Sequence, residues 1–226
     1  RFSVFPHENF VDLFLVQFGW EQCESLYSYG PHVRNNYLFH YIISGKGHLE
    51  VRQRDGSLRT YPLRAGQGFL ICPNQVTTYC ADEKDPWAYT WVEFGGVQAQ
   101  YRLTLAGLGE DQPVYTPIQP DMALEIKDEL LFIANHAQFS ALKLMAHFYL
   151  FLDALIDSSS SKQRVRGLSQ QGFYIREAIH FIDQYYREDI RIEQIASFCG
   201  LNRTYFSRLF KEVMGRTPAG RAARRG

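Results

Sequence analysis

The spacing of apolar residues changes once along this chain, near residue 120, and that change limits the fold more than any other feature. Between Phe10 and Phe94, short apolar runs alternate with turn residues such as Asp55-Gly56 and Pro73-Asn74. Short strands bounded in this way predict a barrel or sandwich of antiparallel strands rather than a parallel sheet. From residue 122 onward the apolar residues recur at helical spacing. The chain is therefore predicted to belong to the α+β class.

The helical part begins with a predicted pair of helices over residues 122–156, with a break near residues 135–140. Their apolar faces, built on residues such as Leu131 and Leu144, are wide. We therefore expect one helix to cover the β-domain and the other to pair with a second subunit, which predicts a homodimer. Residues 95–120 are predicted to be mainly connection, and the polar stretch that follows the second helix is predicted to be a linker. The predicted divisions are 1–118 for the β-domain, 119–160 for the helical hairpin, 161–171 for the linker and 172–226 for a second, helical domain.

Charge is distributed unevenly, although the chain as a whole has a formal net charge of zero. Residues 1–171 contain 14 Lys and Arg against 18 Asp and Glu, whereas residues 172–226 contain 10 against 6. An acidic first part and a basic second part are typical of a sensor joined to a module that binds an anion. The alternative is a chance imbalance.

The four cysteines are scattered, without a Cys-x-x-Cys pair or a neighbouring histidine at ligand spacing. This pattern predicts no zinc site and is typical of a reducing compartment. The chain also contains no apolar run of transmembrane length and no recognisable leader segment, so a cytoplasmic protein with no membrane partner is expected.

The last fifty residues predict a helix-turn-helix. A first helix is expected around Ile175 and Ile182, and a second from Ile192 to Cys199, with Gly200 in the turn. Asn202 can cap a third helix. The predicted buried side of that helix consists of Phe206, Leu209, Phe210 and Val213.

The outward face of the third helix has the side chains that a helix in the major groove needs. Arginine can bind guanine through two hydrogen bonds, serine and threonine can reach base edges, and lysine neutralises phosphate. A charged helix face that simply contacts solvent is the alternative. The candidate DNA-binding residues are Arg203, Thr204, Ser207, Arg208 and Lys211.

The C-terminal part resembles the DNA-binding signature of the AraC family of transcription regulators. The resemblance implies that Thr204, Ser207 and Arg208 face bases, while Arg203 and Lys211 lie nearer phosphate. Nine positions at fixed spacing carry it: Ala196, Gly200, Phe206, Arg208, Phe210, Lys211, Gly215, Thr217 and Pro218.

Two departures from the family pattern qualify that resemblance. The family usually places Ser or Thr where Arg191 caps the second helix. Its DNA-binding domain also contains two helix-turn-helix units, whereas residues 219–226 lack the apolar residues that would begin a joining helix. The resemblance therefore implies an incomplete DNA-binding domain, with weak and largely non-specific DNA binding by these 226 residues.

Three stretches between residues 34 and 96 resemble the sugar-sensing branch of the same family. They begin at Arg34, Leu63 and Pro86, respectively. The resemblance implies a cupin-like β-barrel, also called a double-stranded β-helix, that binds a small sugar. It also implies that the ligand-binding residues are Arg34, Tyr79, Tyr89 and Trp91.

The residue types fit that role. Sugar rings present apolar C–H faces and a rim of hydroxyl groups, so their sites pair aromatic side chains with a few hydrogen-bonding groups. Trp87, Tyr89 and Trp91 alternate and should share one face of a strand, with Tyr79 expected on a neighbouring strand. An aromatic core without a ligand is the alternative, and Trp87 is better explained as core or rim.

Enzymes of the cupin type are the competing class, and they hold a metal with several closely spaced ligands. Here His40 stands alone in its strand, between Leu38 and Ile42, and no nucleophile–base pair is recognisable. We therefore predict no enzymatic activity, no cofactor and no metal.

The sequence predicts a transcription regulator of carbohydrate utilisation genes, controlled by a small sugar and acting on double-stranded operator DNA. RNA polymerase is a further candidate partner. The alternative is a cupin-type carbohydrate-binding or metabolic protein whose C-terminal helices are structural.

Overall fold

The computed structural model describes residues 2–5, 12–53, 55–96, 98–163, 172, 174–175, 178–179, 182, 191–199 and 201–214. The chain divides into two compact units, Arg1–Arg164 and Val165–Gly226. The first unit thus contains both the β-domain and the helical hairpin. No helix in the described part of the chain is long and apolar enough to cross a membrane.

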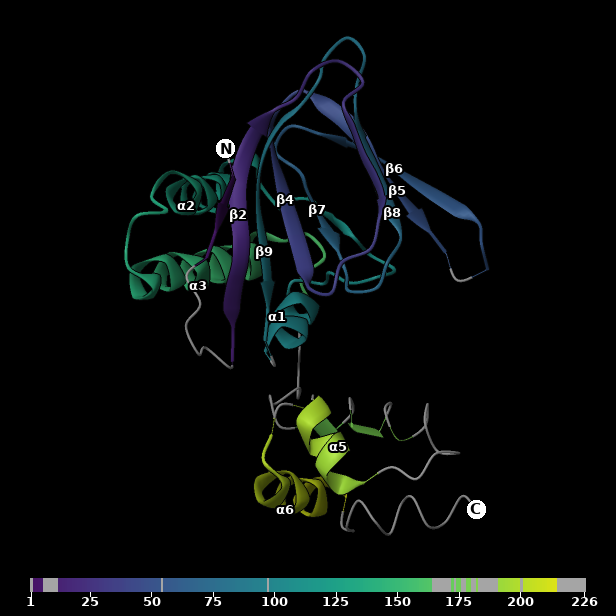
Figure 1. Ribbon diagram of the computed structural model, residues 1–226, viewed down its shortest axis with the longest axis vertical. Helices are drawn as coiled ribbons and strands as arrows, with labels where there is room; N and C mark the ends of the chain where they lie inside the picture. The colour runs from purple at the N-terminus through teal and green to yellow at the C-terminus, as the bar shows by residue number, and fades with distance from the viewer. Residues whose placement is uncertain are drawn as a thin grey trace. The chain divides into compact units, whose positions relative to one another are not determined.

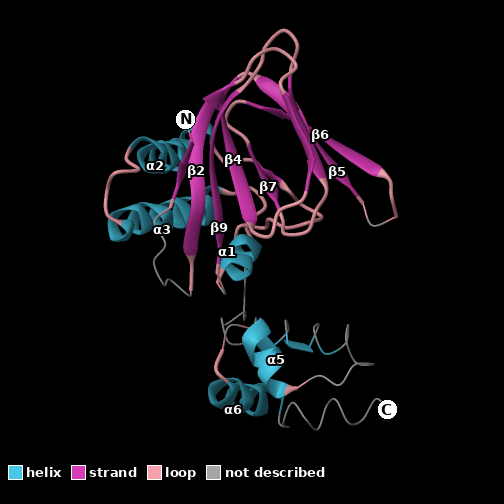
Figure 2. Cartoon of the chain, in the orientation of Figure 1, coloured by secondary structure: helices cyan, strands magenta, loops and turns pink. Residues whose placement is uncertain are grey.

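Two antiparallel sheets form the β-domain of the first unit (Figure 1, Figure 2). The larger sheet has the strand order β1 (Phe2–Val4), β2 (Phe14–Gln22), β9 (Ala88–Gly95), β4 (Tyr37–Ser44), β7 (Gly68–Ile71) and β10 (Val114–Tyr115). The smaller sheet has the order β3 (Ser28–His32), β8 (Thr77–Ala81), β5 (Lys46–Arg52) and β6 (Leu58–Arg64). No ladder joins the two sheets among the described strands, so the predicted barrel is not closed by hydrogen bonds.

The helical hairpin covers the outer face of the larger sheet. It consists of α2 (Ala123–Asn135) and α3 (Ala141–Ser158), with the break between them where the sequence predicted it. The side chain of Ser140 accepts a hydrogen bond from the backbone N–H of Lys143 and so caps α3. The predicted α+β architecture, with a β-domain, a helical hairpin and a separate helical unit, is confirmed.

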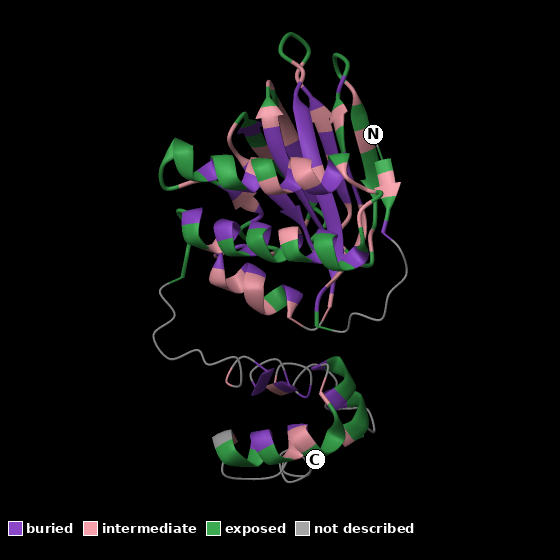
Figure 3. Ribbon diagram, turned by 90° about the vertical axis from the view of Figure 1, so that its left-hand side faces the viewer, coloured by how far each residue is buried: buried purple, intermediate pink, exposed green. Residues whose placement is uncertain are grey.

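Residues of the central strands point alternately to two separate apolar clusters. In β4, Phe39 and Tyr41 face the helices and belong to the cluster that includes Phe148 and Phe151. Leu38 and Ile42 face the smaller sheet and belong to a second cluster between the sheets. The sheet is therefore buried on both faces, and Figure 3 shows buried segments along its central strands.

The apolar faces on which we based the dimer prediction are buried within the first unit itself. Leu130, Leu144, Phe148 and Leu152 pack in the cluster between the hairpin and the larger sheet. These four side chains are therefore not available to a second subunit, and Leu131 is half-buried. The apolar side chains that do reach the surface of α3 are Leu142, Tyr149 and Leu150, with exposed fractions of 70%, 45% and 46%.

Residues 95–120 contain more regular structure than the glycine and proline content predicted. Helix α1 (Ala99–Leu105), strand β10 and the short 3-10 helix η1 (Pro120–Met122) all lie there. The first long strand, β2, begins at Phe14, although the apolar runs that predicted strands begin near Phe10. The predicted hairpin at Asp55-Gly56 is present, but residues 53–57 separate its strands, so the turn is longer than two residues.

The second unit contains the predicted helix-turn-helix elements. Described residues between 172 and 182 are helical, and Ile175, Ala178 and Ile182 are buried. Helix α5 (Ile192–Phe198) is followed by α6 (Arg203–Met214). Phe206, Leu209 and Phe210 are buried as predicted. Tyr186, Gly200 and residues 215–226, with the signature positions Gly215, Thr217 and Pro218, lie outside the described residues.

Hydrogen bonds at the helix ends explain the turn. The backbone N–H of Leu201 donates to the carbonyl of Ala196 at 2.8 Å, which closes the end of α5. The side-chain oxygen of Asn202 accepts from the backbone N–H of Tyr205 at 2.8 Å, as the capping prediction required. At the start of α5, the backbone N–H of Arg191 donates to the side-chain oxygen of Gln194 at 2.8 Å. This bond supplies half of a capping box without a Ser or Thr.

Candidate effector cavity and DNA-binding helix

A cavity of about 180 Å³ lies between the two sheets of the first unit. Aromatic side chains dominate its wall, together with a few polar groups. Its lining consists of Phe2, Gln17, Glu21, Tyr27, Tyr29, Arg34, Leu38, His40, Tyr79, Tyr89 and Trp91. This combination of ring faces and convergent polar groups is what a small hydroxylated ligand needs.

The four residues predicted to bind ligand all line this one cavity. Tyr89 and Trp91 come from β9, and Arg34 comes from the segment between β3 and β4. Tyr79 comes from β8, which belongs to the opposite sheet, so the expectation of a strand neighbouring β9 is wrong. Trp87 is fully buried and packs against Tyr89, with ring centroids 6.0 Å apart, so it is part of the core.

Strand register explains how the wall is assembled, because residues directly opposite in antiparallel strands share a face. One row across β2, β9, β4 and β7 consists of Gly19, Trp91, His40 and Phe69. Gly19 has no side chain to cover the neighbouring indole. The adjacent rows place Gln17 opposite Glu93 and Glu21 opposite Tyr89.

Ring contacts hold the aromatic wall in place. Tyr29 stacks on Tyr79 with centroids 5.4 Å apart, which joins β3 to β8. Phe2 of the N-terminal strand lies 5.9 Å from Trp91, centroid to centroid. The hydroxyl of Tyr89 donates to Glu21 at 3.1 Å. Burial raises the pKa of Tyr79 and of Tyr89, so both hydroxyls remain protonated and can donate or accept hydrogen bonds.

Glu93 is a buried carboxylate that the sequence analysis missed. It follows Trp87, Tyr89 and Trp91 in the same alternation, and that period-two pattern could have identified it. Its Oε2 lies 2.8 Å from Nη1 of Arg34, and its Oε1 accepts from Asn36 at 3.1 Å. Gln17 donates to it as well. Glu93 therefore anchors the arginine that the sequence predicted.

His40 lies in the wall as a neutral side chain. Burial, and secondarily the positive charge of Arg34, hold its pKa well below the ordinary value of 6.5. Its ring stacks on Phe69 at 4.4 Å, and its Nδ1 has no hydrogen-bond partner among the described residues. The sequence indicated only an isolated histidine at this position, whereas the structure places it in the wall of the cavity.

Nothing in the described part of the chain resembles a metal centre. No three His, Cys, Asp or Glu side chains gather there as a metal site would require. A second, more open cavity of about 760 Å³ lies beside the turn between β5 and β6. Its lining, which includes Arg52, Asn74, Glu110 and Asp111, contains no aromatic side chain among the described residues and none of the predicted binding residues.

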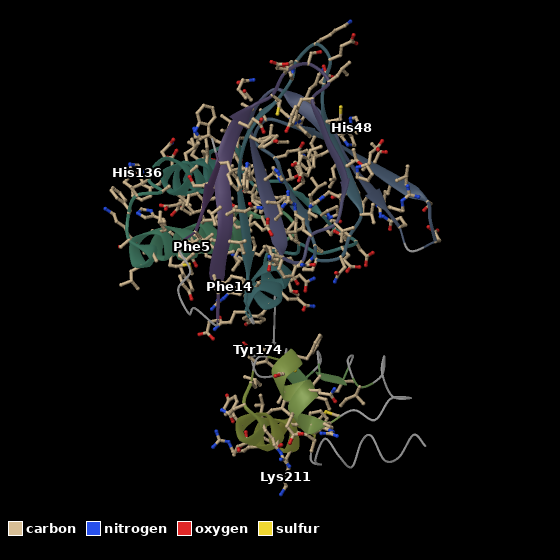
Figure 4. The ribbon with its side chains drawn as sticks, viewed as in Figure 1. Phe5, Phe14, His48, His136, Tyr174 and Lys211 are labelled. Atoms are coloured by element: carbon tan, nitrogen blue, oxygen red, sulfur yellow. The ribbon has the colours of Figure 1, made fainter. Side chains whose placement is uncertain are left out.

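Helix α6 presents the predicted DNA-binding residues on the side opposite its buried face. Arg203, Thr204, Arg208 and Lys211 are exposed, and Ser207 is half-buried. The Lys211 side chain points outward from the helix (Figure 4). Arg203 pairs with Glu193 of α5 at 2.7 Å, and Arg208 lies over the ring of Tyr205. Exposed ion pairs of this kind contribute little to stability.

Comparison with known proteins identifies both units. Residues 14–152 match the sequence model of the AraC-like ligand binding domain. Residues 182–219 match that of the bacterial regulatory helix-turn-helix proteins of the AraC family. This chain belongs to the AraC family. It is therefore a DNA-binding transcription regulator and not an enzyme.

Relatives within the AraC family align over most of the chain. The Msm operon regulatory protein of Streptococcus mutans serotype c is 29% identical over 213 residues, which cover 93% of this chain and 74% of that protein. The raffinose operon transcriptional regulatory protein RafR of Pediococcus pentosaceus is 27% identical, covering 89% and 72%. Among solved structures, ToxT from Vibrio cholerae is 14% identical with a TM-score of 0.39, covering 93% of this chain and 98% of that one.

The buried neutral histidine predicts how the stability of this AraC family member depends on pH. When the pH falls through 6.5, His40 takes up a proton in the unfolded chain but not in the folded one. The free energy of unfolding should then decrease by up to about 1.4 kcal/mol per pH unit. Urea denaturation between pH 8 and pH 5, followed by tryptophan fluorescence, measures this slope. All three tryptophans lie in the first unit.

Replacing the buried histidine should flatten the slope. We expect His40→Leu to show a smaller loss of stability on acidification, whereas His48→Leu, at a more exposed histidine on β5, should leave it unchanged. Equal slopes in the wild type and His40→Leu would contradict this assignment.

Proposed function

We propose that this AraC family regulator controls carbohydrate utilisation genes and that its effector is a small sugar bound between the two sheets. The observation that carries the proposal is the cavity wall, in which Trp91 and Tyr89 lie beside Arg34 and His40. A sugar ring can place its C–H face on the indole and its hydroxyls on the polar groups. The relative named for a raffinose operon supports a carbohydrate effector.

Effector binding would act by population shift. A sugar that binds one arrangement of the two units more tightly than another favours that arrangement by the ratio of the two affinities. The domain divisions predicted from the sequence, with a linker at residues 161–171, are part of this proposal. So are a cytoplasmic location and contact with RNA polymerase, because a regulator of transcription must reach both the DNA and the polymerase.

Sugar binding is tested first by thermal unfolding of the full chain against a panel of mono- and disaccharides. A ligand at 100 times its dissociation constant should add about 2.7 kcal/mol of stability. Trp91→Ala removes the platform, and we expect the dissociation constant measured by calorimetry to increase tenfold or more, which is about 1.4 kcal/mol. Trp20→Ala, at a half-exposed tryptophan on the other face of β2, is the matched control. Undiminished sugar affinity in Trp91→Ala would contradict the assignment of Trp91 to the binding site.

We propose that α6 enters the major groove of double-stranded operator DNA. Arg203, Thr204, Ser207, Arg208 and Lys211 lie along its outward side. In this arrangement Thr204, Ser207 and Arg208 contact base edges, while Arg203 and Lys211 contact phosphates.

The two kinds of DNA contact should respond differently to mutation. Lys211→Ala should weaken binding to all sequences alike and reduce the slope of log affinity against log salt by about 0.9. Arg208→Ala should broaden the base preference at one position among sequences enriched from a random pool. Fluorescence anisotropy over a salt series measures the first effect, with Lys143→Ala on α3 as a control of equal charge. A salt slope unchanged by Lys211→Ala would contradict the phosphate contact.

We also propose that the regulator is a homodimer in which a second copy covers the outer face of α3. Leu142, Tyr149 and Leu150 recur there at spacings of seven and eight residues, which keeps them on one side of the helix. Two recognition helices held in one dimer can contact two half-sites of an operator. Residues of the described hairpin that face its own sheet take no part in this contact.

The dimer proposal predicts that charge on the outer face of α3 dissociates the protein. Leu142→Glu with Leu150→Glu should give a monomer by light scattering at tens of micromolar, since burying unpaired carboxylates in an apolar contact is costly. Leu58→Glu, at an exposed leucine of β6, is the control. A wild type that is monomeric at this concentration would exclude the proposed interface.

A further inference from the structure

The positive charge of Arg34 is already paired before any ligand binds. Its Nη1 lies 2.8 Å from Oε2 of Glu93, and the exposed fractions of the two side chains are 15% and 7%. Asn36 and Gln17 also donate to the same carboxylate. Donors thus reach both carboxylate oxygens, so Glu93 is fixed in place and the ion pair is shielded from water.

The other ionisable groups around the cavity add no positive charge. His40 is neutral, because its pKa is held well below the ordinary value. Glu21 is a second carboxylate in the wall, where it accepts the hydroxyl of Tyr89. Among the described residues, this site therefore contains two carboxylates and one guanidinium.

We propose that Glu93 makes the cavity selective for uncharged hydroxylated rings and excludes sugar phosphates and sugar acids. This inference rests on the proposed function, since it specifies the ligand class of the same site. Arginine has five N–H donors. Nη1 contacts Glu93 through one of them, and the guanidinium keeps other donors for hydroxyl oxygens. The Arg34–Glu93 pair thus carries no net charge but still offers hydrogen-bond donors to a ligand. Glu93 acts as a positioning residue through Arg34.

An anionic ligand would meet a double penalty in this wall. It must lose its hydration on entering, and it finds no unpaired cation to replace that hydration. To reach the charge of Arg34 it must displace Glu93, which would leave a carboxylate with an exposed fraction of 7% unpaired. An uncharged sugar avoids both costs, because its hydroxyls can donate to the carboxylates and accept from the guanidinium.

The experiment compares ligands that differ only in charge. Hexoses such as glucose and galactose are paired with their uronates and their 6-phosphates, and binding to the full chain is measured by thermal unfolding and calorimetry. Each uncharged sugar that binds should do so at least tenfold more tightly than its acidic counterparts. This ratio in the wild type tests the inference without depending on any variant.

A near-isosteric substitution then removes the compensating charge. Glu93→Gln should reduce the ratio of the affinity for an uncharged sugar to the affinity for its acidic counterpart at least tenfold, because Arg34 then becomes an unpaired cation. Glu93→Asp keeps the carboxylate and should restore most of the discrimination. Glu50→Gln, on the outer face of β5, changes the net charge equally and should leave the ratio as it is in the wild type. A purely structural role for Glu93 would lower the affinity for both ligand classes alike.

The outcomes separate this inference from the proposed function. Binding of uronates or phosphates as tightly as of the uncharged sugars would overturn the charge selection while leaving sugar sensing intact. The charge selection would also be overturned if Glu93→Gln left the ratio of the two affinities unchanged. Stabilisation by none of the uncharged or charged sugars would contradict the proposed function itself.

Discussion

Burial of the larger sheet on both faces is the constraint on which the first unit depends. Its outer face packs Phe39, Val92 and Phe94 against the helical hairpin, in a cluster that holds most of the buried apolar side chains of this unit. Each fully buried side chain of this kind contributes about 1.5–3 kcal/mol. That stabilisation allows the inner face to hold Glu93 and His40, polar groups whose burial would otherwise be too costly. The hairpin thus supports the cavity without contacting it.

Most of the architecture could be predicted from the local periodicity of apolar residues in the sequence. The two hairpin helices and the helix-turn-helix were predictable because each of their signals involves residues that are close in sequence. These signals are the apolar spacing, the capping residues and a glycine at the turn. The departure from the family pattern at Arg191 does not leave the start of α5 uncapped, because the side chain of Gln194 accepts a hydrogen bond from the backbone N–H of Arg191. The four residues predicted to bind ligand line one cavity, and for Tyr89 and Trp91 the resemblance and the strand alternation pointed to the same positions.

Features that depend on contacts distant in sequence were harder to predict. The sheet to which Tyr79 belongs is decided by the pairing of β8 with β3 and β5, and no pattern within β8 indicates it. In the sequence, Glu93 is only a polar residue near the end of a strand. Its partners Arg34 and Asn36 come from the segment between β3 and β4, which is distant in sequence. Helix α1 was missed because the surrounding glycines and prolines dominate the composition of residues 95–120. The outward positions of α3 were overlooked because the same helix is more apolar on its buried side.

The irregular pairing of β2 with β9 lets this strand vary in length without altering the cavity wall. Between Leu15 and Gln17 the register shifts, with Val16 as the extra residue. Beyond that bulge, Gln17 and Glu21 lie opposite Glu93 and Tyr89 and face the cavity. Without Val16, Leu15 and Gln17 would be consecutive residues opposite Phe94 and Glu93, so the strand would pair regularly and each side chain would keep its face. The bulge is therefore a point at which this strand can gain or lose one residue while the polar lining contributed by β2 stays in place.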